Sequence, residues 1–128
     1  MNIRQVTDGK EDYIELLRAG DPDESRIRKL LEKGELFLLE EHGKLRTLCI
    51  VIFSEEKKCE IKNIVNHKKG IREKVNGRYM IHYICEHYCA QYDWVYMKKE
   101  RCLDIMEFCE KCGFSDEDEK YLKKRTDV

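Results

Sequence analysis

The longest uninterrupted apolar run of this 128-residue chain, residues 48–53, most limits the folds open to it. Six residues are far fewer than the roughly 20 that a membrane-spanning helix needs, so the run predicts a buried strand. Strand-like segments flank it and are joined to it by polar connections of hairpin length. The centre of the chain is therefore predicted to form an antiparallel meander of three strands, at 36–41, 45–53 and 58–65.

Two helices are predicted before this meander. A first strand at 2–6 ends at a turn, and apolar residues at helical spacing predict a short helix over 10–18. A second helix is predicted over 22–33. In this interpretation Asp21 is its N-cap, Pro22 occupies the first turn, and Gly34 ends it in the left-handed conformation.

The second half of the chain alternates helices and strands. Apolar residues repeat at intervals of three and four over 76–91, which predicts an amphipathic helix. A short strand at 94–97, a helix over 102–111 and a weak strand at 120–123 follow. This order predicts a single domain, 1–128, of the α+β class, with a mixed, mostly antiparallel central sheet flanked by helices.

Charge and cysteine content narrow the function classes. The 25 Lys and Arg residues nearly balance the 26 Asp and Glu residues, for a formal net charge of −1, so no global field attracts nucleic acid or an anionic membrane. We expect neither partner. Seven cysteines are an odd number for a disulfide framework, and the first residues show no signal-peptide pattern. We therefore expect reduced thiols in the cytoplasm.

A local excess of positive charge lies between residues 67 and 78. One acid, Glu73, stands there among five basic residues, Lys68, Lys69, Arg72, Lys74 and Arg78. The segment leads into a predicted helix, whose free N–H groups and positive dipole end can cradle a pyrophosphate. The alternative is a solvated basic loop without a ligand.

Four segments carry a resemblance to a known family: Asp21-Pro22, residues 34–39, residues 59–65 and residues 108–114. In order and spacing they resemble the successive blocks of the GNAT acyltransferases, which transfer an acyl group from acyl-coenzyme A to an amine. The resemblance covers most of residues 1–114 and implies the GNAT fold. It also implies a truncated C-terminus, because only 14 residues follow Phe114.

The resemblance implies acetyl-CoA as the cofactor, an unidentified amine as the acceptor, and leaves a homodimer open. The implied cofactor-binding residues are Ile64, Val65, Arg72, Glu73, Lys74, Val75, Asn76, Gly77 and Arg78. Val75 stands where the family has a glycine, and a β-branched residue strongly disfavours a positive φ. We therefore expect either a reshaped loop or weaker cofactor binding.

The resemblance also implies a catalytic apparatus. Glu60 matches a position that some GNAT proteins use as a general base, although a strand-surface carboxylate paired with a lysine is the alternative. Cys109 stands where the family often has a tyrosine that protonates the departing thiolate. A backbone N–H near Ile64 or Val65 would stabilise the oxyanion.

Two other interpretations compete with an active enzyme. A zinc or redox site could be drawn from two cysteine pairs, Cys85 with Cys89 and Cys109 with Cys112, with His82 and His87 nearby. Cysteines four apart on a helix usually act as small apolar fillers, so no metal site is expected. A catalytically inactive GNAT-fold binding or regulatory module is the stronger alternative. Val75, Cys109 and the short C-terminus favour it.

Overall fold

The computed structural model describes residues 2–67, 73–101 and 106–127. They form one seven-stranded sheet in the order β1-β2-β3-β4-β5-β7-β6. The strands are β1 (Asn2–Val6), β2 (Glu35–Glu41), β3 (Lys44–Ser54), β4 (Lys58–Asn66), β5 (Trp94–Lys98), β6 (Ser115–Asp116) and β7 (Tyr121–Arg125). All neighbouring strands are antiparallel except β4 and β5, which are parallel. The mixed, mostly antiparallel sheet is thus confirmed.

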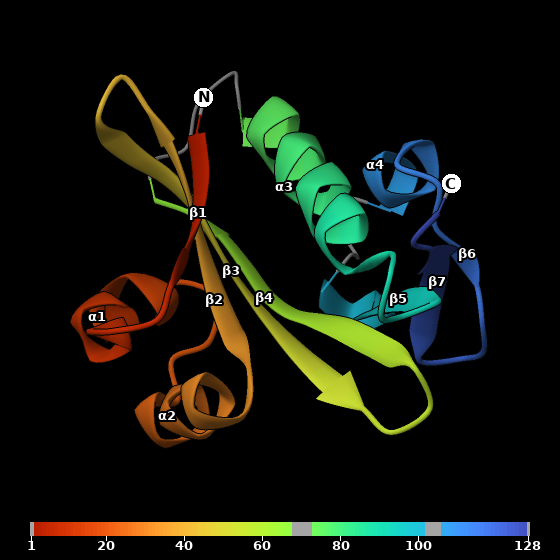
Figure 1. Cartoon of the computed structure of the whole chain (residues 1–128), viewed down its shortest axis with the longest axis horizontal. Coiled ribbons are helices and arrows are strands. Elements are labelled where there is room, and N and C mark those ends of the chain that lie inside the picture. The colour runs from red at the N-terminus through yellow and green to blue at the C-terminus, as the bar shows by residue number, and fades with distance from the viewer. Residues whose placement is uncertain (1, 68–72, 102–105, 128) are drawn as a thin grey trace.

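Helices cover both faces of the sheet. The α-helices are α1 (Ile14–Leu17), α2 (Glu24–Lys33), α3 (Glu73–Tyr88) and α4 (Met106–Lys111), and two 3-10 turns are η1 (Lys10–Tyr13) and η2 (Lys99–Arg101). Figure 1 shows α1 and α2 on one side of the sheet and α3 and α4 on the other. None of the helices in the described residues is long and apolar enough to cross a membrane.

The side-chain alternation of the strands divides the core in two. Residues of one parity on β2 and β3, such as Phe37 and Val51, pack under α3, whereas Leu38 and Ile50 pack under α1 and α2. Because opposite faces of a strand carry alternate residues, the central strands are buried on both sides. This double burial explains the uninterrupted apolar run at 48–53.

The predicted meander and the two long helices are confirmed, with corrections at their ends. Asp23, not Asp21, is the N-cap of α2, and its Oδ1 accepts a hydrogen bond from the Arg26 N–H at 3.2 Å. Asp21 is instead buried and accepts from the Asp23 N–H at 3.1 Å. The Asp21 carboxylate therefore holds the N-cap residue in place but is not itself the N-cap.

The prediction of a left-handed Gly34 was wrong. Its φ of −114° and ψ of −167° are extended, so the chain passes directly from α2 into β2. The residue is glycine because a Cβ there would lie 2.3 Å from the Val51 carbonyl oxygen. A glycine is required at position 34 because the helix and the sheet approach closely there, and not because of its backbone conformation.

Helix α3 begins and ends three residues earlier than the predicted 76–91. At its end, the N–H groups of Gln91 and Tyr92 both donate to the Tyr88 carbonyl, at 3.0 and 2.9 Å, and close the last turn. The final helix is described from Met106 onward, so the first residues of the predicted 102–111 lie outside the described part. The predicted strand at 120–123 is β7, which β6 extends into a short hairpin.

Candidate active site

The sheet opens between β4 and β5. Lys58 to Glu60 pair with Trp94 to Tyr96, and no further pair between the two strands follows within the described residues. A cavity of about 260 Å³ lies beyond the last pair, lined by Gly20, Ile61, Lys62, Asn63, Ile64, Met97 and Glu100. The edge of β4 that faces this cavity offers backbone groups to an extended ligand.

A bulge in β4 lies at this opening. On β3, Val51 pairs with Ile61 and Ile50 pairs with Asn63, so Lys62 has no partner of its own in the ladder. A bulge bends its strand and increases the local twist. It therefore helps to turn the second half of β4 away from β5.

Ile64 and Val65 lie on β4 beyond the bulge, as the sequence placed them. Ile64 packs against the core under α3, and Val65 pairs with Leu48 of the other face. Because successive N–H groups of a strand point to opposite edges, one of these two N–H groups points toward β3 and the other into the opening. One donor is therefore available to an oxygen placed there.

The first turns of α3 carry the described part of the basic segment. Val75 lies inside the helix and is 50% exposed, so it does not need a positive φ. Asn76 is 5% exposed, and its Oδ1 accepts no hydrogen bond from the described residues. Gly77 packs on α4, because a Cβ there would lie 3.4 Å from Phe108 Cζ. Arg72 and the side chains of Glu73 and Lys74 lie outside the described part.

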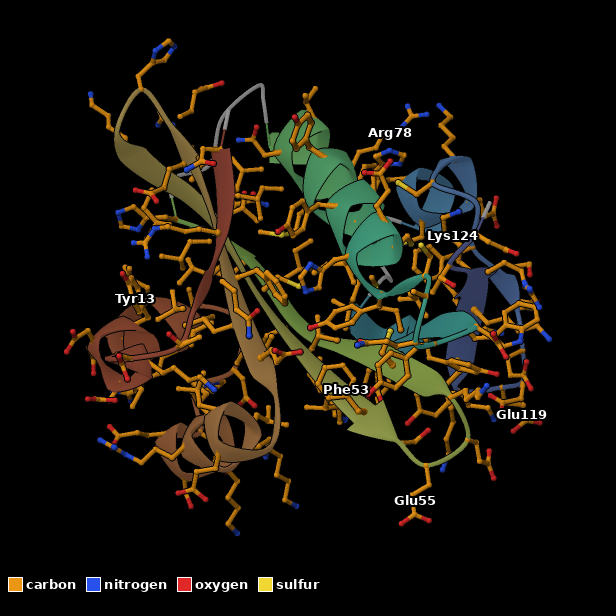
Figure 2. The ribbon with its side chains drawn as sticks, in the orientation of Figure 1. Tyr13, Phe53, Glu55, Arg78, Glu119 and Lys124 are labelled. Atoms are coloured by element: carbon orange, nitrogen blue, oxygen red, sulfur yellow. The ribbon has the colours of Figure 1, made fainter. Side chains whose placement is uncertain are left out.

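Cationic side chains gather where α3 meets α4 and β7. A cavity of about 280 Å³ there is lined by Arg78, Lys111 and Lys124, together with His82 and Cys112. Figure 2 shows Arg78 and Lys124 on the α4 side of the molecule. This cavity extends the positive charge of the basic segment along α3.

Glu60 lies on the opposite face of the sheet. It pairs with Ile52, which packs against the core under α1 and α2. Its Oε2 lies 3.3 Å from Lys62 Nζ, and its side chain is 17% exposed. The lysine-paired carboxylate considered as the alternative is therefore present, and it stands beside the opening.

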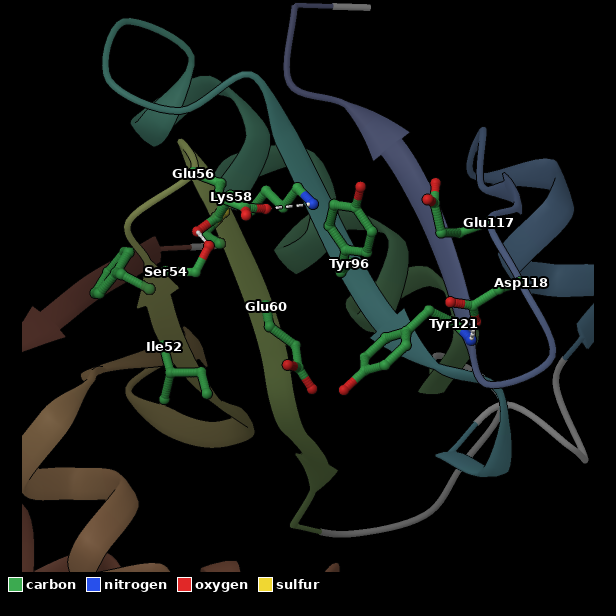
Figure 3. Close-up of a pocket in the computed structure, with 11 residues that line it drawn as sticks. Ile52, Ser54, Glu56, Lys58, Glu60, Tyr96, Glu117, Asp118 and Tyr121 are labelled. Atoms are coloured by element: carbon green, nitrogen blue, oxygen red, sulfur yellow. Dashed lines mark hydrogen bonds and ion pairs between the residues drawn. The ribbon is translucent and has the colours of Figure 1, made fainter.

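Glu60 also lines a second cavity, of about 350 Å³, between the ends of β3, β4 and β5 and the β6–β7 hairpin. Figure 3 shows the Glu60 carboxylate and the Tyr121 hydroxyl directed toward one another in this cavity. Burial raises the pKa of Tyr121, and the nearby Glu60 raises it further. Tyr121 therefore stays protonated and can donate a hydrogen bond.

Other charges around this second cavity are already paired. Lys58 Nζ lies 2.9 Å from a Glu56 oxygen, and Lys123 Nζ lies 2.7 Å from a Glu117 oxygen. Asp118 accepts hydrogen bonds from the N–H groups of Lys120 and Tyr121, which lower its pKa. Glu60 is paired as well, with Lys62, but its carboxylate and the Tyr121 hydroxyl are the two groups directed toward one another in this cavity.

Cys109 lies in α4 and is fully buried in the core under α3. Cys112 is partly exposed, and burial raises its pKa. None of the six described cysteines forms a disulfide, and no group of three or more metal-ligating side chains occurs among the described residues. The structure thus places Cys109 among apolar side chains and Glu60 at a cavity.

The sequence did not single out Tyr121 or Asn63. Tyr121 belongs to the tail hairpin, 61 positions after Glu60, and only the pairing of β5 with β7 brings it to the same cavity. Asn63 was part of the strand motif at 62–65, which indicated a strand end rather than a polar side chain facing a cavity.

No family model and no curated protein matches the sequence. Solved structures do match. A GNAT family acetyltransferase from Elizabethkingia anophelis with acetyl-CoA bound has a TM-score of 0.79 at 17% identity, with 97% of each chain covered. The IAA acetyltransferase from Bacillus cereus has a TM-score of 0.80 at 14% identity, covering 97% of this chain and 98% of that one.

A eukaryotic protein shares the same architecture. Tetrahymena GCN5 has a TM-score of 0.78 at 13% identity, covering 98% of this chain and 96% of that one. At such identities the similarity establishes the fold. The chain has the GNAT fold over nearly its whole length, as the sequence resemblance implied.

Proposed function

We propose that this chain, which has the GNAT fold, is an N-acetyltransferase that uses acetyl-CoA. The observation that carries the proposal is the opening between β4 and β5, with helix α3 on one face of the sheet and Glu60 on the other. A thioester reaching the opening from the α3 side would meet an amine approaching from the Glu60 side. The odd number of cysteines supports action in the cytoplasm.

The residues proposed to bind acetyl-CoA combine charge with free backbone groups. The N-terminus of α3, with the basic residues of the segment that leads into it and of its first turns, suits the phosphates; these residues are Arg72, Lys74 and Arg78. The open edge of β4 suits the amide groups of an extended pantetheine arm. Val75 is compatible with this arrangement, because the helix has replaced the turn in which a glycine would be needed.

The proposed chemistry requires one proton to leave the amine and one to reach the thiolate. Glu60 would accept the proton of the attacking ammonium, directly or through water. An N–H of Ile64 or Val65 would stabilise the oxyanion while the C–N bond forms and the C–S bond breaks. Cys109 would return a proton to the departing sulfur. Tyr121 would help to hold the amine beside Glu60.

A specific observation favours a second candidate, an inactive binding module. Cys109 is fully buried, and Glu60 is already paired with Lys62. Neither side chain would then take part in proton transfer, whereas the cofactor-binding surface would persist.

Calorimetry with acetyl-CoA, followed by a thiol assay of CoA release with a panel of amines, separates these candidates. Binding with amine-dependent release is the result expected of the enzyme. Binding without release from any amine would support the binding module. Absence of binding would contradict both.

A further inference from the structure

Asn63 is a buried amide with unused hydrogen-bonding capacity. Its side chain is 3% exposed, and its Nδ2 has no hydrogen-bond partner among the described residues. Buried polar groups nearly always have a partner, because an unpaired donor loses its bonds to water without replacement. An unpaired buried donor that lines a cavity, as Asn63 does, therefore indicates a position at which a ligand can accept a hydrogen bond.

The side chain faces the acceptor side of the proposed site. Asn63 pairs with Ile50, which is buried under α1 and α2, and Glu60 pairs with Ile52 of the same face. Directly opposed residues of an antiparallel pair share a face. Asn63 and Glu60 therefore stand on one side of β4, with the bulged Lys62 between them, and α3 lies on the other side.

The α1–α2 connection lies directly on Asn63. A Cβ at Gly20 would lie 3.2 Å from Asn63 Oδ1 and 2.6 Å from Val65 Cγ2. The carbonyl end of the amide is thus turned toward this connection. The Nδ2 end, on the other branch of the amide, lies farther from Gly20 than the carbonyl end does.

The cavity has one basic side chain among its described lining residues, Lys62, which is paired with Glu60, and one acidic side chain, Glu100. These described residues therefore offer no excess positive charge to compensate a carboxylate. A neutral oxygen, in a carbonyl or hydroxyl group, is the partner that suits an amide donor in this setting.

We propose that Asn63 determines acceptor specificity by donating a hydrogen bond from Nδ2 to a neutral oxygen that the acceptor carries close to its amine. This inference rests on the proposed acetyltransferase function. The acceptor class is then amino alcohols and amino amides, in preference to plain alkylamines of the same shape.

Two matched pairs of amines test this class: ethanolamine with n-propylamine, and glycinamide with isobutylamine. In the first pair a methyl group replaces the hydroxyl group, and in the second pair two methyl groups replace the carbonyl oxygen and the amide nitrogen. The kcat/KM ratio within each pair is measured by CoA release for the wild-type protein and for Asn63→Leu. Comparing the two proteins cancels the difference in amine basicity. We expect the preference for the oxygen-bearing amine to fall about tenfold in Asn63→Leu.

The thermal midpoint of unfolding without ligand gives a second readout. Asn63→Leu should keep or raise it, since the change removes an unpaired buried donor. Asn66→Leu is the matched control on the same strand, because Asn66 Oδ1 accepts a hydrogen bond from the buried Thr47 hydroxyl at 2.8 Å. That variant should unfold at a lower temperature.

Three outcomes would overturn the inference. An unchanged ratio in Asn63→Leu, with transfer intact, would remove Asn63 from acceptor recognition and leave the proposed function standing. A loss of thermal stability in Asn63→Leu as large as that in Asn66→Leu would show that the amide is satisfied within the protein. Transfer to no amine at all would contradict the proposed function as well.

Discussion

At the scale of single residues, the candidate site depends on a few polar groups set against apolar surroundings. Glu60 reaches a cavity from β4, and Tyr121 meets it from β7. Cys109 is held in the core. Substitutions of Glu60 and Cys109 separate proton transfer from cofactor binding, because both groups are proposed to move protons and neither is proposed to hold the cofactor.

Glu60→Gln should lower kcat about 100-fold while the dissociation constant for acetyl-CoA changes less than about twofold. The amide keeps the shape of the side chain but cannot accept the proton of the ammonium. Steady-state CoA release and calorimetry measure the two quantities. Glu56→Gln is the control, since Glu56 lines the same cavity and its 75% exposed side chain pairs with Lys58. Equal loss in both variants would contradict the role of Glu60.

Cys109→Ser should depress acetyl transfer and leave acetyl-CoA affinity nearly unchanged, because an acid acting on the leaving thiolate contributes to the transition state alone. Cys112→Ser, on the same helix but partly exposed, should retain activity. Thermal unfolding of both variants shows whether the buried hydroxyl destabilises α4. Full activity in a folded Cys109→Ser variant would exclude Cys109 as the acid.

At the scale of elements, two glycines allow close contacts, one between a helix and the sheet and one between two helices. Gly34 lets α2 run directly into β2 against β3, and Gly77 lets α3 rest on α4. The two positions differ in the room available. A Cβ at Gly34 would meet a backbone oxygen at 2.3 Å, whereas one at Gly77 would meet an aromatic ring at 3.4 Å.

Gly34→Ala should therefore lower the free energy of unfolding by about 1–3 kcal/mol, since a backbone atom cannot move aside as a side chain can. Gly77→Ala should raise it by up to about 1 kcal/mol, because alanine has the higher helix propensity. Urea unfolding measures both values. A Gly34→Ala variant as stable as the wild type would show that the helix and sheet are not in this contact.

At the scale of the whole molecule, charge and burial are distributed unevenly. Although the net charge is only −1, basic residues are concentrated along α3. Buried cysteine thiols lie on both β4 and α3. We therefore expect acetyl-CoA binding to depend on salt concentration through the basic residues, and the stability of the fold to depend on pH through the buried thiols.

Arg78→Ala should weaken acetyl-CoA binding and reduce its dependence on salt concentration, because ionic contacts near the surface are screened by salt. Calorimetry at low and high sodium chloride concentration measures both effects. The control is Arg28→Ala on α2, whose guanidinium pairs with Glu24 at 3.0 Å on the other side of the sheet. Equal salt dependence in the wild type and in Arg78→Ala would place the phosphates elsewhere.

Burial should make the protein less stable in alkali. It raises the pKa of Cys59 to about 12 and that of Cys85 to about 11, from an ordinary value of 9.0. The unfolded chain therefore loses these protons first, so stability is full below pH 9.0 and falls as pH rises toward 11–12. The thermal midpoint should fall less steeply with pH in Cys85→Ala than in the wild type. Cys89→Ala, at an exposed position, should behave as the wild type.

The sequence by itself determined most of the elements of this protein and their order. Side-chain period and turn chemistry are local, so the meander, α2 and the long helix α3 could be predicted from contiguous residues. The motif at 59–65 likewise placed Glu60 on a strand next to the candidate site. These features depend on neighbours within a few positions along the chain.

The tertiary structure decided which side chains meet. Asn63, Glu60 and Tyr121 share one face of the sheet only because β4 bulges at Lys62 and β7 pairs beside β5. Gly34 is extended rather than left-handed because β3 lies against it, a contact between residues 17 positions apart. The alternation of side chains along a strand predicts which residues share a face. It does not predict which strand pairs with that strand, or where the pairing ends. Those choices depend on burial over the whole sheet, and they form the opening between β4 and β5.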